Sequence, residues 1–195
     1  MSAPVAIVGA GSIGVSWAIV FARAGRSVRM QDPDAARREA VPGEIAARLA
    51  QLDEAGLLDE APDAIAARVT VAADLAATVA RAGHVQECAP ERLELKRELF
   101  ARLDGLAAPD AVLASSSSAI VASRFAEGLP GRARCLVVHP GNPPHLIPVV
   151  EVVPAPFTDP AVVERTVALL EAAGQSPVVV RREIEGFVFN RLQGA

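Results

Sequence analysis

The chain opens with an apolar run that leads directly into three closely spaced glycines. Residues 5–8 are all apolar, which is typical of a strand that is buried on both faces of a parallel sheet. Gly9, Gly11 and Gly14 follow in the spacing GxGxxG, and a helical pattern begins at Ser12. Gly9 permits a tight turn, Gly11 leaves room beside the backbone, and Gly14 lets the helix pack closely on the strand. The sequence therefore predicts a strand, a tight turn and a helix in direct succession.

This turn has the features of a dinucleotide-binding site. The backbone amides of Ser12 and Ile13 would face a pyrophosphate at the positive end of the helix. Asp32 lies 18 residues after Gly14, at the end of the second predicted strand, where a carboxylate binds the adenine ribose hydroxyls and repels a 2′-phosphate. We therefore expect NAD rather than NADP as the cofactor. The alternatives are FAD, which normally needs a longer chain, and a turn that binds nothing.

Apolar runs alternate with helical patterns along most of the chain. We expect strands at residues 5–8, 27–31, 69–72, 84–88, 111–115, 134–139, 149–153 and 176–181. Helical patterns cover residues 12–24, 91–106 and 159–173, and a helical stretch at 34–68 is interrupted around Gly56 and Pro62. Strands separated by helices need crossover connections, which favour parallel pairing. We expect an α/β fold: a Rossmann-type, doubly wound, mainly parallel sheet with a helical hairpin inserted after the second strand.

Composition argues against several classes of partner. The formal charge of −4 and the pI near 5.4 offer no electrostatic attraction to nucleic acid or to an anionic membrane. Cys88 and Cys135 stand far apart and no group of metal ligands is evident, so neither a zinc site nor a disulfide framework is expected. Because no signal peptide and no membrane-spanning apolar run is visible, we expect a cytoplasmic protein that binds a small molecule.

A histidine and a glutamate suggest where catalysis takes place. His139 ends an apolar run and opens into the loop HPGNPPHLIP, so it should lie at the carboxyl edge of the sheet, where ligands bind. A neutral imidazole there can take a proton from an alcohol, although a histidine that merely ends a strand remains an alternative. Glu151 lies among valines in the next apolar run. A buried carboxylate needs a partner, and His139 is the obvious candidate.

Four consecutive serines, at residues 115–118, follow another apolar run and should lie at the same edge. One of them is expected to cap the next helix, and a polar turn would explain all four equally well. His145, in the loop after His139, is interpreted as a substrate-rim or structural residue. His84 begins a strand and is interpreted as structural.

These features occur together in a known family. The segments VAIVGAGSIGVSWA, VQECAPERLELKRELFARLD, SSSSA, HPGNPPHLIPVVEVVP and GFVFNRLQ run almost from end to end of the chain. In this order they resemble the NAD-dependent 3-hydroxyacyl-CoA dehydrogenase family, in particular its lambda-crystallin branch, which includes L-gulonate 3-dehydrogenase. The resemblance implies an oxidoreductase that transfers a hydride to NAD from the 3-hydroxyl group of a 3-hydroxyacyl-CoA or of a 3-hydroxy acid such as L-gulonate. It also implies a role in fatty acid metabolism.

The resemblance assigns roles to individual residues. His139 matches the general base, which removes the proton from the 3-hydroxyl group, and Glu151 matches its carboxylate partner. Ser118 matches the serine that hydrogen-bonds the substrate oxygen, and Asn190 matches an asparagine of the substrate site. An NAD-dependent dehydrogenase is therefore the expected enzyme class.

Two further residues match the family, and one segment differs from its usual pattern. Glu91 and Lys96 match residues that contact the cofactor on its ribose and nicotinamide side, although a charged helix face would explain them equally well. The hydroxyacyl-CoA enzymes tend to carry an aromatic pair after the catalytic histidine, where this chain has Pro140 and Gly141. That form looks more like the lambda-crystallin branch, whose substrates need not be CoA esters.

The resemblance also predicts how the chain divides into domains. We expect residues 1–185 to form the NAD-binding domain and residues 186–195 to begin a helical domain, which in the family completes the substrate cleft and makes the dimer. Since the rest of that domain is absent, we expect a homodimer only for a full-length protein, and we expect this chain to bind NAD better than it turns over substrate. The alternative is a non-catalytic NAD-binding module, such as a crystallin-like structural protein or a redox sensor.

Overall fold

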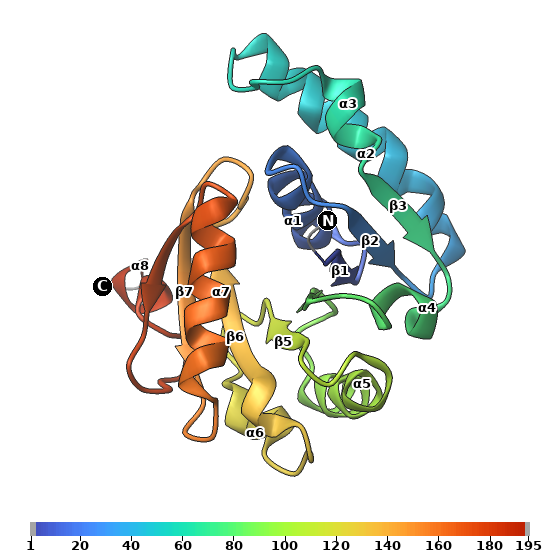
Figure 1. The fold of residues 1–195 in the computed structure, drawn as a ribbon. Coiled ribbons are helices and arrows are strands. Elements are labelled where there is room, and N and C mark those ends of the chain that lie inside the picture. The colour runs from blue at the N-terminus through green and yellow to red at the C-terminus, as the bar shows by residue number, and fades with distance from the viewer. Residues whose placement is uncertain (1–2, 194–195) are drawn as a thin grey trace.

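An eight-stranded sheet forms the centre of the molecule, in the order β3-β2-β1-β4-β5-β6-β7-β8 (Figure 1). The computed structural model describes residues 3–193. The strands are β1 (Val5–Val8), β2 (Val28–Gln31), β3 (Val69–Ala72), β4 (His84–Glu87), β5 (Val112–Ser115), β6 (Cys135–Pro140), β7 (Val149–Pro154) and β8 (Ser176–Val179). Neighbouring strands pair in parallel except β6 and β7, which are antiparallel. The predicted mainly parallel sheet is confirmed.

Helices cover both faces of this sheet (Figure 1). They are α1 (Ser12–Arg23), α2 (Ala35–Glu54), α3 (Pro62–Ala66), α4 (Leu75–Val79), α5 (Leu93–Leu106), α6 (Ala122–Ala126), α7 (Pro160–Ala172) and α8 (Phe189–Gln193), with a 3-10 turn at Arg132–Arg134. One buried cluster joins the sheet to α1, α2 and α7. A second cluster joins its other face to α4, α5 and α6. Two covered faces explain why β1 is apolar throughout and why most residues of β5, β6 and β7 are apolar.

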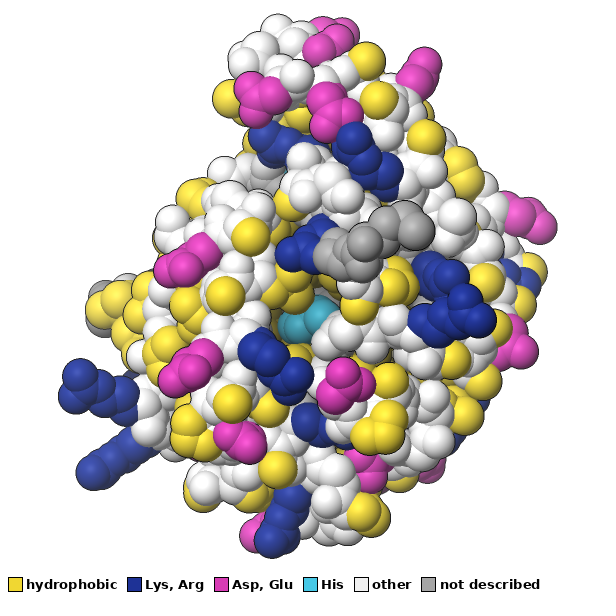
Figure 2. All heavy atoms as spheres, in the orientation of Figure 1, with side chains coloured by type: hydrophobic (Ala, Val, Ile, Leu, Met, Phe, Trp, Pro, Cys, Tyr) yellow, Lys and Arg dark blue, Asp and Glu magenta, His cyan; other side chains and the backbone are white. Residues whose placement is uncertain are grey.

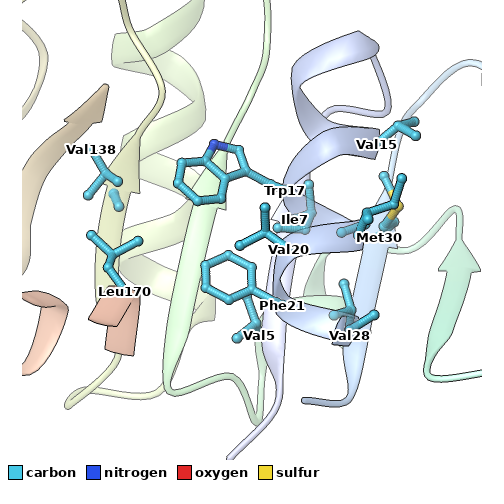
Figure 3. Packing of buried hydrophobic residues seen from close by; sticks show 14 of the residues in the cluster. Val5, Ile7, Val15, Trp17, Val20, Phe21, Val28, Met30, Val138 and Leu170 are labelled. Carbon is cyan, nitrogen blue, oxygen red and sulfur yellow. The ribbon is translucent and has the colours of Figure 1, made fainter. Parts of the chain in front are cut away.

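Helix α1 lies at the centre of the first cluster (Figure 3). Its Trp17 and Phe21 rings stack with their centroids 5.4 Å apart, and both side chains are fully buried. They lie between the first strands of the sheet and the side chains of Val138 and Leu170 (Figure 3). The helix therefore packs against both halves of the sheet, which holds its first turn rigidly above β1.

The helical hairpin predicted between the second and third strands consists of α2 and α3. Asp34 caps α2 by accepting a hydrogen bond from the Ala36 amide at 2.9 Å, as expected for an N-cap aspartate. Its buried side chains, among them Val41, Ile45 and Leu49, join the cluster around α1. No helix in the described residues 3–193 is both long and apolar enough to cross a membrane.

The strand order creates a crevice at one edge of the sheet. The chain proceeds from β1 outward to β3 and then returns to place β4 on the other side of β1. Such a reversal leaves an opening at the carboxyl ends of the strands, where doubly wound proteins bind ligands. Gly9, Cys88, Ser116 and His139 all lie at or just beyond those ends.

Candidate active site

Two adjoining cavities occupy this carboxyl edge. The larger measures about 870 Å³ and is lined by Gly9, Gly11 and Asp32, among others. The smaller measures about 260 Å³ and is lined by Ile13, Glu91, Ser118 and His139, among others. Cys88 and Ala89 line both cavities. A ligand that spans both cavities would therefore contact the glycine turn at one end and His139 at the other.

The glycine turn has the geometry that its spacing predicts. Gly9 has a φ of +106°, and a Cβ there would lie 2.7 Å from the backbone of Cys88. A Cβ on Gly14 would overlap the carbonyl oxygen of Gly9, so the close packing of α1 on β1 depends on this glycine. At Gly11 a Cβ would meet no atom within 4 Å, although this residue lines the larger cavity. The backbone of α1 is thus open to a ligand at its positive end.

Asp32 is held beside this turn. One carboxylate oxygen accepts a hydrogen bond from the Ala10 amide at 2.8 Å, and the other accepts one from the Asp34 amide at 2.9 Å. Both bonds leave lone pairs free toward the cavity that Asp32 lines. The structure therefore brings Asp32 to the glycine turn, as a ribose-binding carboxylate requires.

The sequence analysis missed Arg37, which lines the same cavity. Its Nη2 donates to the carbonyl of Ala10 at 2.6 Å, and its Nη1 forms an ion pair with Glu44 at 2.8 Å. The hydrogen bond to Glu44 raises the pKa of Arg37 above its usual value. Since its donors are engaged within the protein, this guanidinium fixes the turn and α2 relative to each other. An arginine five residues after Asp32 was the signal that could have found it.

His139 and Glu151 face each other across the antiparallel pair β6 and β7. His139 Nδ1 lies 2.8 Å from Glu151 Oε2, and the two residues are only 6 % and 4 % exposed. Because Nδ1 is engaged by the carboxylate, Nε2 is the nitrogen left to act in the smaller cavity. The ring packs against Phe187, with centroids 5.3 Å apart.

The second oxygen of Glu151 is also bonded. Oε1 accepts hydrogen bonds from the amides of Val188 at 2.8 Å and Phe189 at 3.0 Å, at the start of α8. Hydrogen bonds from backbone amides favour the ionised form of a carboxylate. Because a carboxylate oxygen accepts, Nδ1 of His139 carries the hydrogen toward Glu151 and Nε2 carries the lone pair.

The serine loop after β5 is ordered by Glu91. Its Oε1 accepts hydrogen bonds from the Ser117 hydroxyl and from the amides of Ser118 and Ala119, both at 3.1 Å. Burial alone would raise the pKa of Glu91, but the Ser117 hydrogen bond, the Lys96 charge and the loop amides outweigh it and lower the pKa. Asn190 joins this loop as well, since its Nδ2 donates to the Ser118 carbonyl at 2.7 Å.

Lys96 does not line either cavity. Its ammonium is 1 % exposed and lies 2.9 Å from Glu87 Oε2 and 3.5 Å from Glu91 Oε2. Its expected contact with the cofactor therefore stays a prediction, and the structure places the charge behind Glu91. Glu87, which also accepts hydrogen bonds from the Ser115 hydroxyl and the Ala89 amide, was missed. The signal that singled out Glu151, a carboxylate among valines, is absent at Glu87, because residues 84–88 read HVQEC.

Comparison with known proteins shows which family this chain resembles in sequence. Residues 4–184 match the family model described as "3-hydroxyacyl-CoA dehydrogenase, NAD binding domain". A lambda-crystallin homolog from Bos taurus is 45 % identical over 198 aligned residues, covering 100 % of this chain and 62 % of that protein. An L-carnitine dehydrogenase from Streptomyces griseus is 43 % identical, covering 98 % of this chain and 56 % of that protein. The chain thus spans about 60 % of the length of these relatives.

A solved structure of a 3-hydroxyacyl-CoA dehydrogenase type is also similar to this chain. The crystal structure of 3-hydroxybutyryl-CoA dehydrogenase from Escherichia coli K12 has a TM-score of 0.86 and 31 % identity, covering 92 % of this chain and 38 % of that one.

Proposed function

The chain belongs to the 3-hydroxyacyl-CoA dehydrogenase family, of which it carries the NAD-binding domain, and we propose that it uses His139 as the general base in oxidising the 3-hydroxyl group of a 3-hydroxy acid or its CoA thioester. The observation that carries this proposal is the contact of His139 Nδ1 with Glu151 Oε2 at 2.8 Å, with His139 in the wall of a cavity that adjoins the one at the glycine turn.

The residues at the glycine turn fit NAD. The space beside Gly11 and the free amides of the first turn of α1 suit a pyrophosphate. Asp32 suits the hydroxyls of the adenine ribose and opposes a 2′-phosphate. NAD bound in this way supplies the hydride acceptor for the reaction.

The catalytic pair provides the proton transfer. Nε2 of His139 takes the proton from the substrate hydroxyl, and the imidazolium that results is stabilised by Glu151. The amides of Val188 and Phe189 hold Glu151 in place through its second carboxylate oxygen. General-base catalysis of this kind contributes roughly 10²- to 10⁴-fold to the rate.

The serine loop positions the substrate. Ser118 lines the same cavity as His139, so its hydroxyl is available to hydrogen-bond the substrate oxygen. Asn190 and Glu91 hold this loop through the Ser118 carbonyl and amide, respectively. We assign Lys96 an indirect part, in which its charge orients Glu91.

The test is NADH formation by this chain and by a version extended to the length of its relatives. L-gulonate, L-3-hydroxybutyryl-CoA and L-carnitine are compared as substrates. Turnover of one of them by the extended version identifies the substrate class. NAD binding without turnover of any substrate favours a non-catalytic module instead.

Two variants test the mechanism in the version that turns over. His139→Ala should abolish turnover and leave the Kd for NAD unchanged. Glu151→Gln should lower kcat by about 10²-fold, whereas Glu164→Gln on the exposed side of α7 should not. An unchanged rate in His139→Ala would rule out the proposed base.

A further inference from the structure

A third cavity lies at the opposite edge of the sheet, where the strands begin. It measures about 160 Å³ and is lined by the starts of β1, β4 and β5, by the turn before β2 and by α7. A histidine side chain is visible at the bottom of a hollow in the face shown in Figure 2, with basic side chains near the rim. Among the residues that line this cavity are His84, Arg26 and Arg165. The proposed dehydrogenase chemistry uses none of these three side chains.

The protonation of His84 is set by Gln86. The Gln86 Nε2 group donates to Ser116 Oγ at 2.7 Å and to the Val138 carbonyl at 3.4 Å. Since a carbonyl oxygen can only accept, the amide nitrogen of Gln86 faces β6 and its Oε1 faces His84. His84 Nε2, which lies 2.9 Å from that oxygen, must therefore carry the hydrogen.

The other ring nitrogen is an acceptor without a donor. Burial lowers the pKa of His84 to about 4, so the ring is neutral at pH 7 and Nδ1 keeps a lone pair. Within residues 3–193, Nδ1 is buried and has no hydrogen-bond partner. The two nitrogens of an imidazole point in nearly opposite directions. Because Nε2 points along β4 toward Gln86, Nδ1 is turned toward the edge where the cavity lies.

The charges around the cavity are of one sign. Arg26 and Arg165 both line it, and no acidic side chain does. In the part of the chain that the structure describes, neither guanidinium forms an ion pair. Two unpaired positive charges beside a cavity of this size suit a small dianion.

We propose that this cavity binds a small oxyanion that also carries an O–H group, of which hydrogen phosphate is the simplest. The two arginines contact the anionic oxygens, and the O–H group donates to Nδ1 of His84. The site is linked to the catalytic edge by hydrogen bonds, because the chain from His84 through Gln86 ends on Ser116, which lines the cavity of His139.

The test compares inorganic phosphate with sulfate at constant ionic strength and at pH 8, where phosphate is mainly the hydrogen phosphate dianion. Binding is measured by calorimetry, and the ring nitrogens of His84 are followed by NMR in labelled protein. Phosphate should bind about tenfold more tightly than sulfate, which has the same charge and no O–H donor. It should also shift the Nδ1 resonance of His84.

Three arginine variants distinguish specific binding in the cavity from non-specific electrostatic attraction of an anion. Arg26→Gln and Arg165→Gln should each weaken phosphate binding about tenfold. Arg182→Gln, an exposed position outside the cavity, should have no effect, and NAD binding shows that each variant is folded. Equal affinity for phosphate and sulfate, an equal effect of Arg182→Gln, an unmoved His84 resonance, or no phosphate binding would each overturn the proposal.

Discussion

The ammonium group of Lys96 is buried among the carboxylates of Glu87 and Glu91. Removing one partner of such a buried pair leaves an uncompensated charge, which typically costs about 3–5 kcal/mol. An exposed ion pair contributes about 0–1 kcal/mol. The position of a charge, more than its distance to a partner, therefore decides what it contributes.

We predict that Lys96→Met lowers the free energy of unfolding by about 3–5 kcal/mol, because it removes the cation that the buried Glu87 carboxylate contacts. Glu60→Gln is the control, since Glu60 pairs with Arg68 at 2.6 Å but is 42 % exposed. It should cost less than about 1 kcal/mol. Denaturant unfolding measures both, and equal losses in the two variants would contradict the prediction.

The buried neutral state of His84 makes stability depend on pH. Its pKa is lowered to about 4 in the folded protein and is about 6.5 when unfolded. The unfolded state therefore binds the proton first as the pH falls. The neutral His84 therefore contributes about 3 kcal/mol to the free energy of unfolding above pH 6.5. This contribution is lost as the pH falls toward 4.

We predict that His84→Asn flattens the slope of unfolding free energy between about pH 6.5 and 4. His145→Asn is the control: burial and two nearby arginines lower the pKa of His145 as well, but this residue is more exposed. Urea unfolding at a series of pH values measures the slope. If the slope of unfolding free energy against pH were unchanged in His84→Asn, other groups would be responsible for it.

At the scale of elements, the contact between β1 and α1 depends on a missing side chain. A Cβ on Gly14 would overlap the carbonyl oxygen of Gly9. The carbonyl belongs to the backbone of the glycine turn, so it cannot yield without moving the turn. Gly43 in α2 offers the opposite case, because a Cβ there would meet no atom within 4 Å.

We predict that Gly14→Ala destabilises the chain and raises the Kd for NAD at least about tenfold, because α1 must move away from β1. Gly43→Ala should instead stabilise it by about 0.5–1 kcal/mol, as expected for alanine inside a helix. Thermal unfolding and NAD titration test both variants. Normal NAD affinity in Gly14→Ala would show that the turn tolerates the side chain.

Six of the eight strands differ from their predicted bounds by one or two residues at an end. The strand expected to begin at Arg134 begins at Cys135. Arg134 belongs instead to the 3-10 turn, where its guanidinium forms an ion pair with Asp104 at 2.9 Å. An apolar run shows which residues are buried in the sheet, but it does not show that a long polar side chain beside it binds another element.

At the scale of the whole molecule, the proposed cofactor site is built from distant parts of the sheet. Residues from β1, β2, α2 and α5 line the larger cavity. A ligand that binds there and not to the unfolded chain stabilises the folded state by mass action.

We predict that NAD at one hundred times its Kd stabilises the chain by about 2.7 kcal/mol, whereas NADP at the same concentration stabilises it much less. Asp32 is the reason, because its carboxylate repels a 2′-phosphate. Thermal unfolding with each nucleotide measures the effect. Asp32→Ser should reduce the difference between them, and a wild-type chain that prefers NADP would contradict this assignment.

The sequence by itself determined the features that depend on local geometry and burial. The spacing of Gly9, Gly11 and Gly14 predicted the turn, because only glycine tolerates the positive φ and the close contact. Apolar runs predicted the strands and the doubly wound sheet. A carboxylate among valines predicted the Glu151–His139 pair, since a buried charge needs a partner.

Only the tertiary structure decided which distant groups meet. The Glu87–Lys96 pair, the Arg37–Ala10 bond and the Asn190–Ser118 bond join different elements. Sequence spacing does not restrict such contacts, because they depend on the order of strands and on how each helix packs. The neutral His84 beside two arginines belongs to the same class, since burial and the orientation of Gln86 set its protonation.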